Sequence, residues 1–146
     1  MTGKSGQMLD KDEFVMYQGD TMSLRIYVYG PFRNNDPAQR HLNILSAIET
    51  GEKLARAGFD DIFVPHLYEY WDNKFQHPHE FWMRKCLHEV RRSDVLVGTG
   101  YTSEGSEIEK AEARLWHKPV YDTADEFIKE YRAMEELTKG EFGLGG

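Results

Sequence analysis

The sequence has one cysteine, Cys86, among its 146 residues. A single cysteine excludes an internal disulfide and a zinc module built from several cysteines, and it fits a reducing compartment. No apolar run approaches the roughly 20 residues that a membrane-spanning helix needs. The polar first residues also lack the apolar segment of a secretory signal. From these absences we expect a soluble, cytoplasmic protein.

Basic residues are outnumbered, because 18 Lys and Arg stand against 25 Asp and Glu and give a formal net charge of −7. With no basic run, this balance argues against a partner such as duplex DNA or a membrane surface. A small anion can still bind an acidic protein through a local arginine and a helix N-terminus. The 40% hydrophobic residues are enough for a packed core, so we expect one globular domain.

Composition divides the chain into an N-terminal arm (1–22), a folded domain (23–137) and a glycine-rich flexible tail (138–146). Within the domain, short apolar runs at 24–29, 61–64, 94–99 and 119–121 predict strands. Helical patterns separate them at 37–57, 78–92, 106–116 and 124–137. The aromatic-rich segment 66–79 reads as a loop. Apolar spacing assigns the inner faces of the first two helices to Leu45, Ile48 and Ala55, and to Met83, Leu87 and Val90.

Strands and helices that alternate in this way predict an α/β fold, with a parallel sheet covered by helices on both faces. Ligands of such sheets bind beyond the carboxyl ends of the strands. This rule singles out residues 30–35, 65–71 and 100–106 as the loops that would carry a site.

The segment 100–109 runs from a strand through a Ser/Gly turn into a helix. Backbone N–H groups and the helix dipole favour an anion there, and Glu109 would face the same place. The alternative is structural, because Ser106-x-x-Glu109 has the spacing of a capping box in which Glu109 bonds back to the Ser106 backbone. The segment is neither a P-loop nor a GxGxxG fingerprint.

The first strand ends in Tyr29-Gly30-Pro31-Phe32-Arg33. Gly30 would let a ligand approach the backbone, and the Arg33 fork fits a phosphate or a carboxylate. The alternative is a tight turn with a solvated arginine. Tyr27, within the strand, either belongs to the core or directs its hydroxyl toward the site.

Aromatic residues follow the second strand, and they either stack on a flat base or cover the edge of the core. These residues are His66, Tyr68, Tyr70 and Trp71.

A metal site is the weaker interpretation of a second cluster, which comprises His77, His79, Cys86 and His88. The spacing fits no standard zinc pattern, so we expect no metal and no cofactor. Cys86 lies within a helical pattern without an assigned base, which favours a buried thiol over a nucleophile. A metal-dependent enzyme built on the three histidines is kept as a minor hypothesis.

Five segments together resemble the nucleoside 2-deoxyribosyltransferase-like superfamily, including its nucleoside 5′-monophosphate N-glycosidase branch. They are IYVYGPFR (26–33), NILSAIETGEKLARAGF (43–59), FVPHLYEYW (63–71), HPHEFWMRKCLHEVRRSDVLV (77–97) and SEGSEIEKAEARLWHKPVY (103–121). The most specific piece is Ser-x-Gly-x-x-x-Glu-x-x-x-Ala, here Ser103, Gly105, Glu109 and Ala113.

The resemblance implies a Rossmann-like three-layer sandwich of four to five mostly parallel strands, in a homodimer or a larger homo-oligomer. It implies an enzyme that cleaves the bond between a nucleobase and C1′ of a sugar. Glu109 matches the nucleophile that forms a glycosyl-enzyme, as in a retaining glycosidase, and Tyr27 matches the residue that orients it. Arg33 and Ser103 match positions that hold the 5′-phosphate.

Other substrate-binding positions expected from the resemblance and the loops are Gly30, His66, Trp71, Gly105 and Ser106. The transferase branch carries an acidic residue at the place of Ser103. Serine there, together with Arg33, favours a nucleotide as the small-molecule substrate.

Cys86 departs from the pattern of many relatives, which carry an aspartate eight residues before the position of Asp94. That aspartate helps to protonate the departing base, and a thiol with a pKa of about 8.5 is a poorer acid. Either His79, His88 or Glu89 substitutes, or the base leaves with less help, or the protein binds without turnover. A nucleotide hydrolase, a base-exchange transferase and a non-catalytic nucleotide-binding module are therefore the hypotheses. Asp94 opens a strand at the end away from the site, and we expect it to be structural.

Overall fold

The computed structural model describes residues 24–141. The predicted N-terminal arm lies outside the described residues, and so do residues 142–146 of the predicted tail. The last helix, α5 (Ala124–Glu141), continues past the expected helix end at 137. Residues 138–141 of the expected tail are therefore helical.

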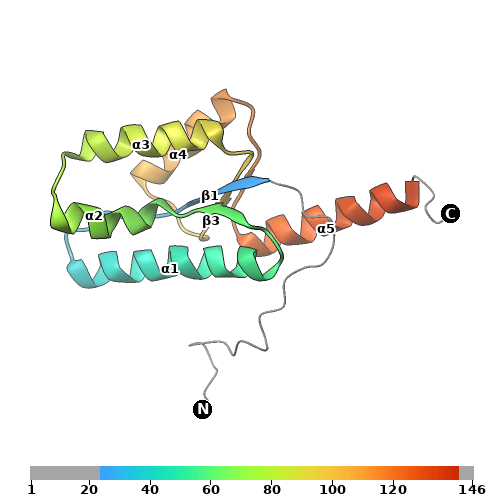
Figure 1. Cartoon of the computed structure of the whole chain (residues 1–146), viewed down its shortest axis with the longest axis horizontal. Helices are drawn as coiled ribbons and strands as arrows, with labels where there is room; N and C mark the ends of the chain where they lie inside the picture. Colours follow the sequence, from blue (N-terminus) through green and yellow to red (C-terminus); the bar gives the residue numbers. More distant parts are fainter. Residues whose placement is uncertain (1–23, 142–146) are drawn as a thin grey trace, which may run out of the picture.

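Four parallel strands form one sheet in the order β2-β1-β3-β4 (Figure 1). They are β1 (Arg25–Tyr29), β2 (Asp61–Phe63), β3 (Val95–Gly98) and β4 (Val120–Tyr121). Each lies within a run that the sequence predicts as a strand. The predicted Rossmann-like α/β sandwich with a four-stranded parallel sheet is confirmed.

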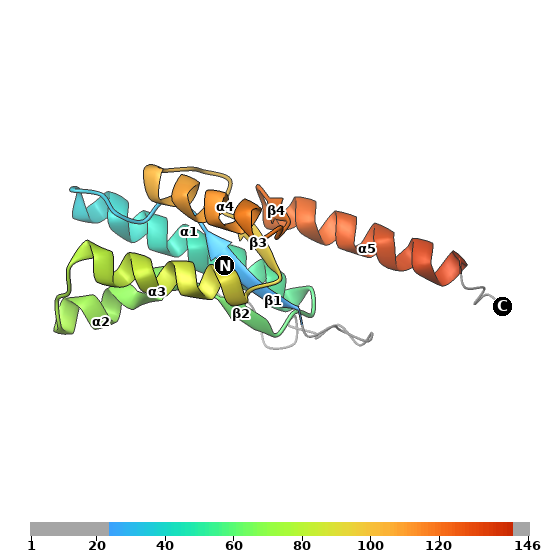
Figure 2. The same cartoon turned by 90° about the horizontal axis from the view of Figure 1, so that it is seen from above.

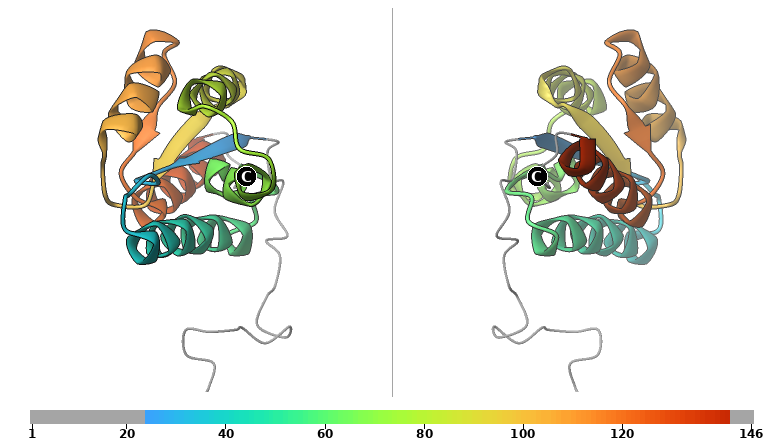
Figure 3. Two further views of the ribbon diagram at one scale, coloured as in Figure 1. Left: turned by 90° about the vertical axis from the view of Figure 1, so that its left-hand side faces the viewer. Right: turned by 90° about the vertical axis from the view of Figure 1, so that its right-hand side faces the viewer.

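Two layers of helices cover the sheet, as the views along it show (Figure 3). One layer contains α1 (Pro37–Arg56) and α5, and the other contains α3 (His79–Arg92) and α4 (Glu104–Leu115). Side chains of the inner strand β1 pack against both helix layers, because successive side chains of a strand point to opposite faces of the sheet. Ile26 and Val28 pack toward α1 and α5, whereas Tyr27 and Tyr29 pack toward α3 and α4. The α3–α4 face therefore receives the two tyrosine side chains.

The inner face of α1 differs from the predicted one. Leu45 and Ile48 are exposed, and the side that packs on the sheet is lined by Ile44, Ala47, Thr50, Gly51 and Leu54. Small residues bring the helix close to the sheet, since a Cβ on Gly51 would lie 3.2 Å from Val64 Cγ2. The positions of the large apolar residues therefore predict the wrong side of α1 as the side that faces the sheet.

The predicted inner face of α3 is correct in part. Val90 is fully buried, but Trp82 and Cys86 complete the buried stripe, and Met83 and Leu87 lie at its margin. The stripe is thus rotated by about one residue from the prediction. This rotation directs Cys86 toward the sheet.

The segment 66–79, which the sequence predicts to be a loop, contains two short helical elements. Residues Pro65–Leu67 form a single 3₁₀ turn and Tyr68–Lys74 form a short helix, α2. Figure 2 shows α2 beside the first turns of α3. The Asp72 carboxylate accepts hydrogen bonds from the His77 backbone N–H (3.0 Å) and from Trp82 Nε1–H (2.7 Å). This tertiary contact stabilises a helix too short to form alone.

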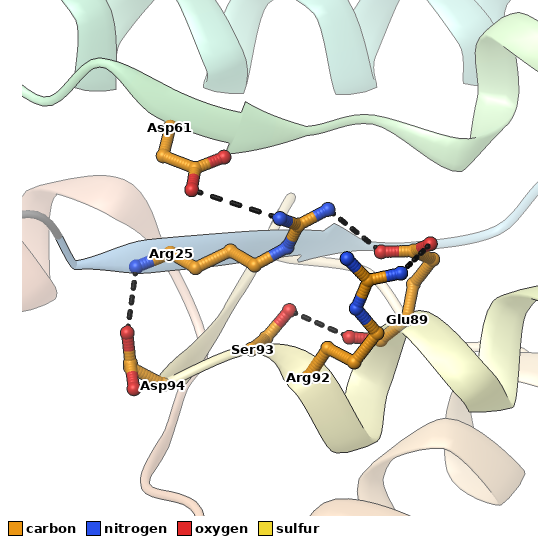
Figure 4. A network of polar contacts seen from close by, with 6 residues as sticks. All are labelled: Arg25, Asp61, Glu89, Arg92, Ser93 and Asp94. Atoms are coloured by element: carbon orange, nitrogen blue, oxygen red, sulfur yellow. Dashed lines mark hydrogen bonds and ion pairs between the residues drawn. The ribbon is translucent and has the colours of Figure 1, made fainter.

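A network of polar contacts lies at the amino-terminal ends of the strands (Figure 4). The backbone N–H of Arg25 donates to Asp94 Oδ2 at 2.8 Å, and the Arg25 guanidinium donates to Glu89 Oε1 at 2.8 Å. Asp94 therefore has a structural role, as predicted, and the Glu89 carboxylate is occupied by its contact with Arg25. Among residues 24–141, no helix is long and apolar enough to cross a membrane.

Candidate functional site

The strand order reverses between β1 and β3, because the chain leaves β1 toward β2 and leaves β3 toward β4. The loops that follow these two strands separate at this point, and ligands of open α/β sheets bind there. The loops approach closely at Gly30, where a Cβ would lie 2.5 Å from Thr99 Oγ1. A side chain at position 30 would therefore force the Thr99 side chain to shift.

A tyrosine–glutamate pair lies beneath these loops, on the α3–α4 face of the sheet. The Tyr27 hydroxyl, at the centre of β1, donates to Glu109 Oε2 on α4 at 2.6 Å. Tyr27 is fully buried and Glu109 is 8% exposed. The short distance is typical of a charge-assisted hydrogen bond. The structure thus brings together the two residues that the resemblance links.

Burial controls the titration of this pair. Loss of solvent raises the pKa of Glu109 to about 7, although the hydrogen bond from Tyr27 opposes the rise. Burial also raises the pKa of Tyr27 well above its usual value, with a further contribution from the Glu109 charge. Tyr27 therefore remains a neutral donor at physiological pH, and Glu109 changes charge near neutrality. A group poised in this way is common at catalytic sites.

Cys86 lies on α3 in the same cluster of buried side chains as Tyr27. Burial raises the pKa of its thiol to about 12, and the Glu109 charge adds to the rise. At neutral pH the thiol is neutral and a very weak acid. The residue that takes the place of the expected aspartate therefore contacts the candidate catalytic pair without supplying a useful proton.

The predicted capping box at the start of α4 is wrong. The helix begins at Glu104, and its N-cap is Ser103, whose Oγ accepts the Ser106 N–H at 3.2 Å. Ser106 lies inside the first turn and its hydroxyl is 2.9 Å from that of Ser103. Because the helix starts earlier than predicted, Glu109 falls in the second turn and points at Tyr27 instead of back to Ser106.

Gly105, the neighbour of Ser103 in the first turn of α4, faces α3. A Cβ at this position would lie 3.9 Å from Met83 Cε, which is ordinary van der Waals contact. A small side chain would therefore fit at this position without a clash.

Arg33 and His66 act at the loop after β1. The Arg33 side chain is exposed and its Nη1 lies 2.7 Å from His79 Nδ1, at the first residue of α3. His66 is 2% exposed, and its Nε2 is 3.2 Å from the carbonyl oxygens of both Gly30 and Pro31. Since carbonyls only accept, His66 Nε2 carries the proton. The buried His66 side chain therefore holds the backbone of this loop at Gly30 and Pro31, whereas the Arg33 side chain faces solvent.

A row of aromatic rings connects the buried pair with the surface. Tyr27 contacts Phe63, which contacts Tyr68, which contacts Trp71, at centroid separations of 5.5, 5.8 and 6.1 Å. Trp71 is 44% exposed, and Lys85 Nζ lies 5.2 Å from its ring centroid. The expected base-stacking residue is thus held in place by its neighbours and is still accessible.

The histidines suspected as metal ligands do not form a cluster. Within the part of the chain that the structure describes, no group of three or more His, Cys, Asp or Glu side chains is placed to bind a metal ion. His77 stacks on Phe81 at a centroid distance of 4.0 Å, and His88 is exposed on α3. His79 Nδ1 is in hydrogen-bond contact with Arg33 Nη1.

Three contributors to the site were not assigned from the sequence: Thr99, Asp72 and the contact of His79 with Arg33. Thr99 meets Gly30, and Asp72 fixes α2 on α3. Each contact joins segments whose partners only the fold reveals. The signal for Thr99 was its place directly after a strand, where sites of such sheets gather.

Comparisons with known proteins gave no match, whether the chain was compared with protein-family models, with curated proteins or with solved structures. An assignment of function therefore rests on the chemistry of the site.

Proposed function

We propose that this protein cleaves the N-glycosidic bond of a nucleoside or deoxynucleoside 5′-monophosphate and releases the free base. One observation carries the proposal: the buried hydrogen bond between Tyr27 and Glu109 lies under the point where the strand order reverses. A carboxylate held by a neutral donor in a water-poor place is a competent nucleophile toward an electrophilic sugar carbon.

In the first step, one Glu109 oxygen forms a bond to C1′ while the C1′–N bond breaks. The electron pair of that bond goes to the base nitrogen, which takes a proton from water. The transition state resembles an oxocarbenium ion, so a nearby carboxylate stabilises it. Tyr27 holds the second oxygen, Oε2, and thereby orients the first. In the second step, water attacks C1′, the ester bond breaks, and the Glu109 carboxylate and a sugar phosphate are formed.

Arg33 and the start of α4 support a phosphorylated substrate. Arg33 is exposed at the loop after β1, and Ser103 caps α4 in the loop after β3. An arginine fork and the N-terminal turn of a helix both bind phosphate oxygens. The aromatic wall at Trp71 offers a face on which a base can stack.

The test is release of free base, followed by chromatography, from a panel of ribo- and deoxyribonucleoside monophosphates and the matching nucleosides. We expect release from a monophosphate and at least 100-fold less from Glu109→Gln, which keeps shape and removes the nucleophile. The matched control is Glu112→Gln, one turn further along α4, where Glu112 binds Arg91 and Trp116 on the surface. Release that persists in Glu109→Gln would contradict the proposal.

Cys86 favours a second candidate, a module that binds a nucleotide without cleaving it. The thiol has a pKa of about 12 where an acid would assist departure of the base. Binding of a monophosphate, measured by calorimetry, without release of base would support this candidate. Base release from nucleosides that needs a second base would instead indicate a deoxyribosyltransferase.

A further inference from the structure

The contact between Arg33 and His79 assigns the protonation of the imidazole. A guanidinium has N–H donors and no acceptor. Because Arg33 Nη1 lies 2.7 Å from His79 Nδ1, Nδ1 must be the acceptor. The imidazole is then neutral, with its proton on Nε2. His79 thus provides a lone pair to a side chain that is exposed and would otherwise be free to move.

A carboxylate on α2 also acts on this guanidinium through its charge. The positive charge of Arg33 contributes to lowering the pKa of Asp72, after the larger effects of the hydrogen bonds from His77 and Trp82. Those two hydrogen bonds hold the Asp72 carboxylate in place. The hydrogen bond of Arg33 to His79 ties the loop after β1 to the first residue of α3.

The position of His79 relates the guanidinium to the catalytic pair. His79 and Cys86 are two helical turns apart, so they lie on the same side of α3, with a rise of about 10 Å between them. Cys86 is at the level of Tyr27 and Glu109. In a nucleotide, the sugar and its 5′ oxygen separate C1′ from the phosphorus. A substrate with C1′ at Glu109 and its phosphate toward Arg33 would extend along this side of the helix.

We propose that His79 is a positioning residue for the 5′-phosphate: its Nδ1 holds the Arg33 guanidinium in the orientation in which it meets the phosphate. The inference rests on the proposed function and adds the residue that sets its specificity. The phosphate oxygens accept from the other N–H groups of the guanidinium, which has five donors, while Nδ1 keeps its own hydrogen bond. Preorganisation of this kind lowers the entropy that ordering an arginine would otherwise cost.

The test compares His79→Ala and His79→Asn, because the Asn amide oxygen can accept near the position of Nδ1. We expect His79→Ala to raise the KM for the monophosphate roughly tenfold and to leave kcat within about twofold. The KM for the matching nucleoside should not change. His79→Asn should recover most of the loss. The control is His88→Ala, an exposed histidine further along the same helix.

Equal losses for monophosphate and nucleoside, or a His79→Asn variant as poor as His79→Ala, would overturn the proposal. A second measurement needs no substrate: ¹⁵N NMR of the imidazoles reports which ring nitrogen carries the proton. We expect the Nε2–H form at His79 and a change in its Nδ1 signal in Arg33→Gln. An Nδ1–H form would refute the positioning role. Absence of turnover with the expected NMR result would instead refute the proposed function alone.

Discussion

The hydrogen bond from Tyr27 to Glu109 should set the pH at which the proposed base release begins. Tyr27→Phe removes the hydroxyl that donates to Oε2 at 2.6 Å and keeps the ring in its buried place. That hydrogen bond lowers the pKa of Glu109 against the effect of burial. Without it, burial acts unopposed and the pKa rises further. The nucleophilic carboxylate then forms only at higher pH.

The size of the effect follows from the strength of the bond. A hydrogen bond to a charged group contributes about 1.5–3 kcal/mol, and one pKa unit corresponds to about 1.4 kcal/mol. The midpoint should therefore rise by about one to two pH units. With a pKa of about 7 in the wild type, half of the protein carries the carboxylate at pH 7. In the variant this fraction is about a tenth to a hundredth, so the rate at pH 7 falls roughly 5- to 50-fold.

The assay is the rate of base release between pH 5 and pH 10, at substrate concentrations below KM. The wild-type rate should rise through about pH 7, and the Tyr27→Phe rate should rise later and approach it at high pH. Tyr29→Phe is the matched control, because the Tyr29 hydroxyl donates to the Tyr121 carbonyl and not to Glu109. A Tyr27→Phe profile with the wild-type midpoint would refute the reasoning.

Three further predictions concern the fold around the site. Glu109→Gln should stabilise the protein by up to about 3 kcal/mol at pH 8, measured by urea unfolding. In the wild type the pKa of Glu109 is raised from 4.5 to about 7, so the folded protein loses stability as the pH rises between these values. The gain in the variant should vanish near pH 4, and a gain that is constant with pH would contradict burial of the charge as its cause. Gly98→Ala should lower the free energy of unfolding by about 1–3 kcal/mol, since its Cβ would lie 2.6 Å from Tyr29 Cζ and 2.8 Å from the Asp122 carbonyl oxygen; an unchanged free energy of unfolding would contradict this reasoning. Iodoacetamide at pH 8 should modify Cys86 far more slowly in the native protein than in urea, because the thiol is buried and has a pKa of about 12; equal rates by mass spectrometry would show an exposed thiol.

The sequence predicted the order of strands and helices well, because short β-branched runs and helical spacings are local signals. It failed where tertiary contacts decide. The helix α2 depends on hydrogen bonds to Asp72 from the His77 backbone, just before α3, and from Trp82 within α3. The inner side of α1 depends on Ala47 and Gly51, whose small size permits close approach although they add little apolar surface.

The site shows the same division. Tyr27 and Glu109 were each candidates from their places in a strand and a helix, but their spacing along the chain carried no sign of contact. Proximity in the sequence made Ser106 and Glu109 look like a capping box, whereas Ser103 starts the helix. The pairing of Arg33 with His79 joins the loop after β1 to the first residue of α3, and only the fold reveals it. Apart from the Tyr27–Glu109 pair, which the resemblance linked, only the packing shows which of these residues contact one another.

The proposed reaction requires a covalent bond between Glu109 and the sugar. Protein quenched with acid during turnover of a monophosphate that carries fluorine at C2′, which slows the second step, would be digested and the masses of its peptides measured. We expect a peptide containing Glu109 that is heavier by one fluorinated sugar phosphate, and no such peptide from Glu109→Gln. Base release without any adduct on that peptide, or an adduct on another residue, would refute Glu109 as the nucleophile.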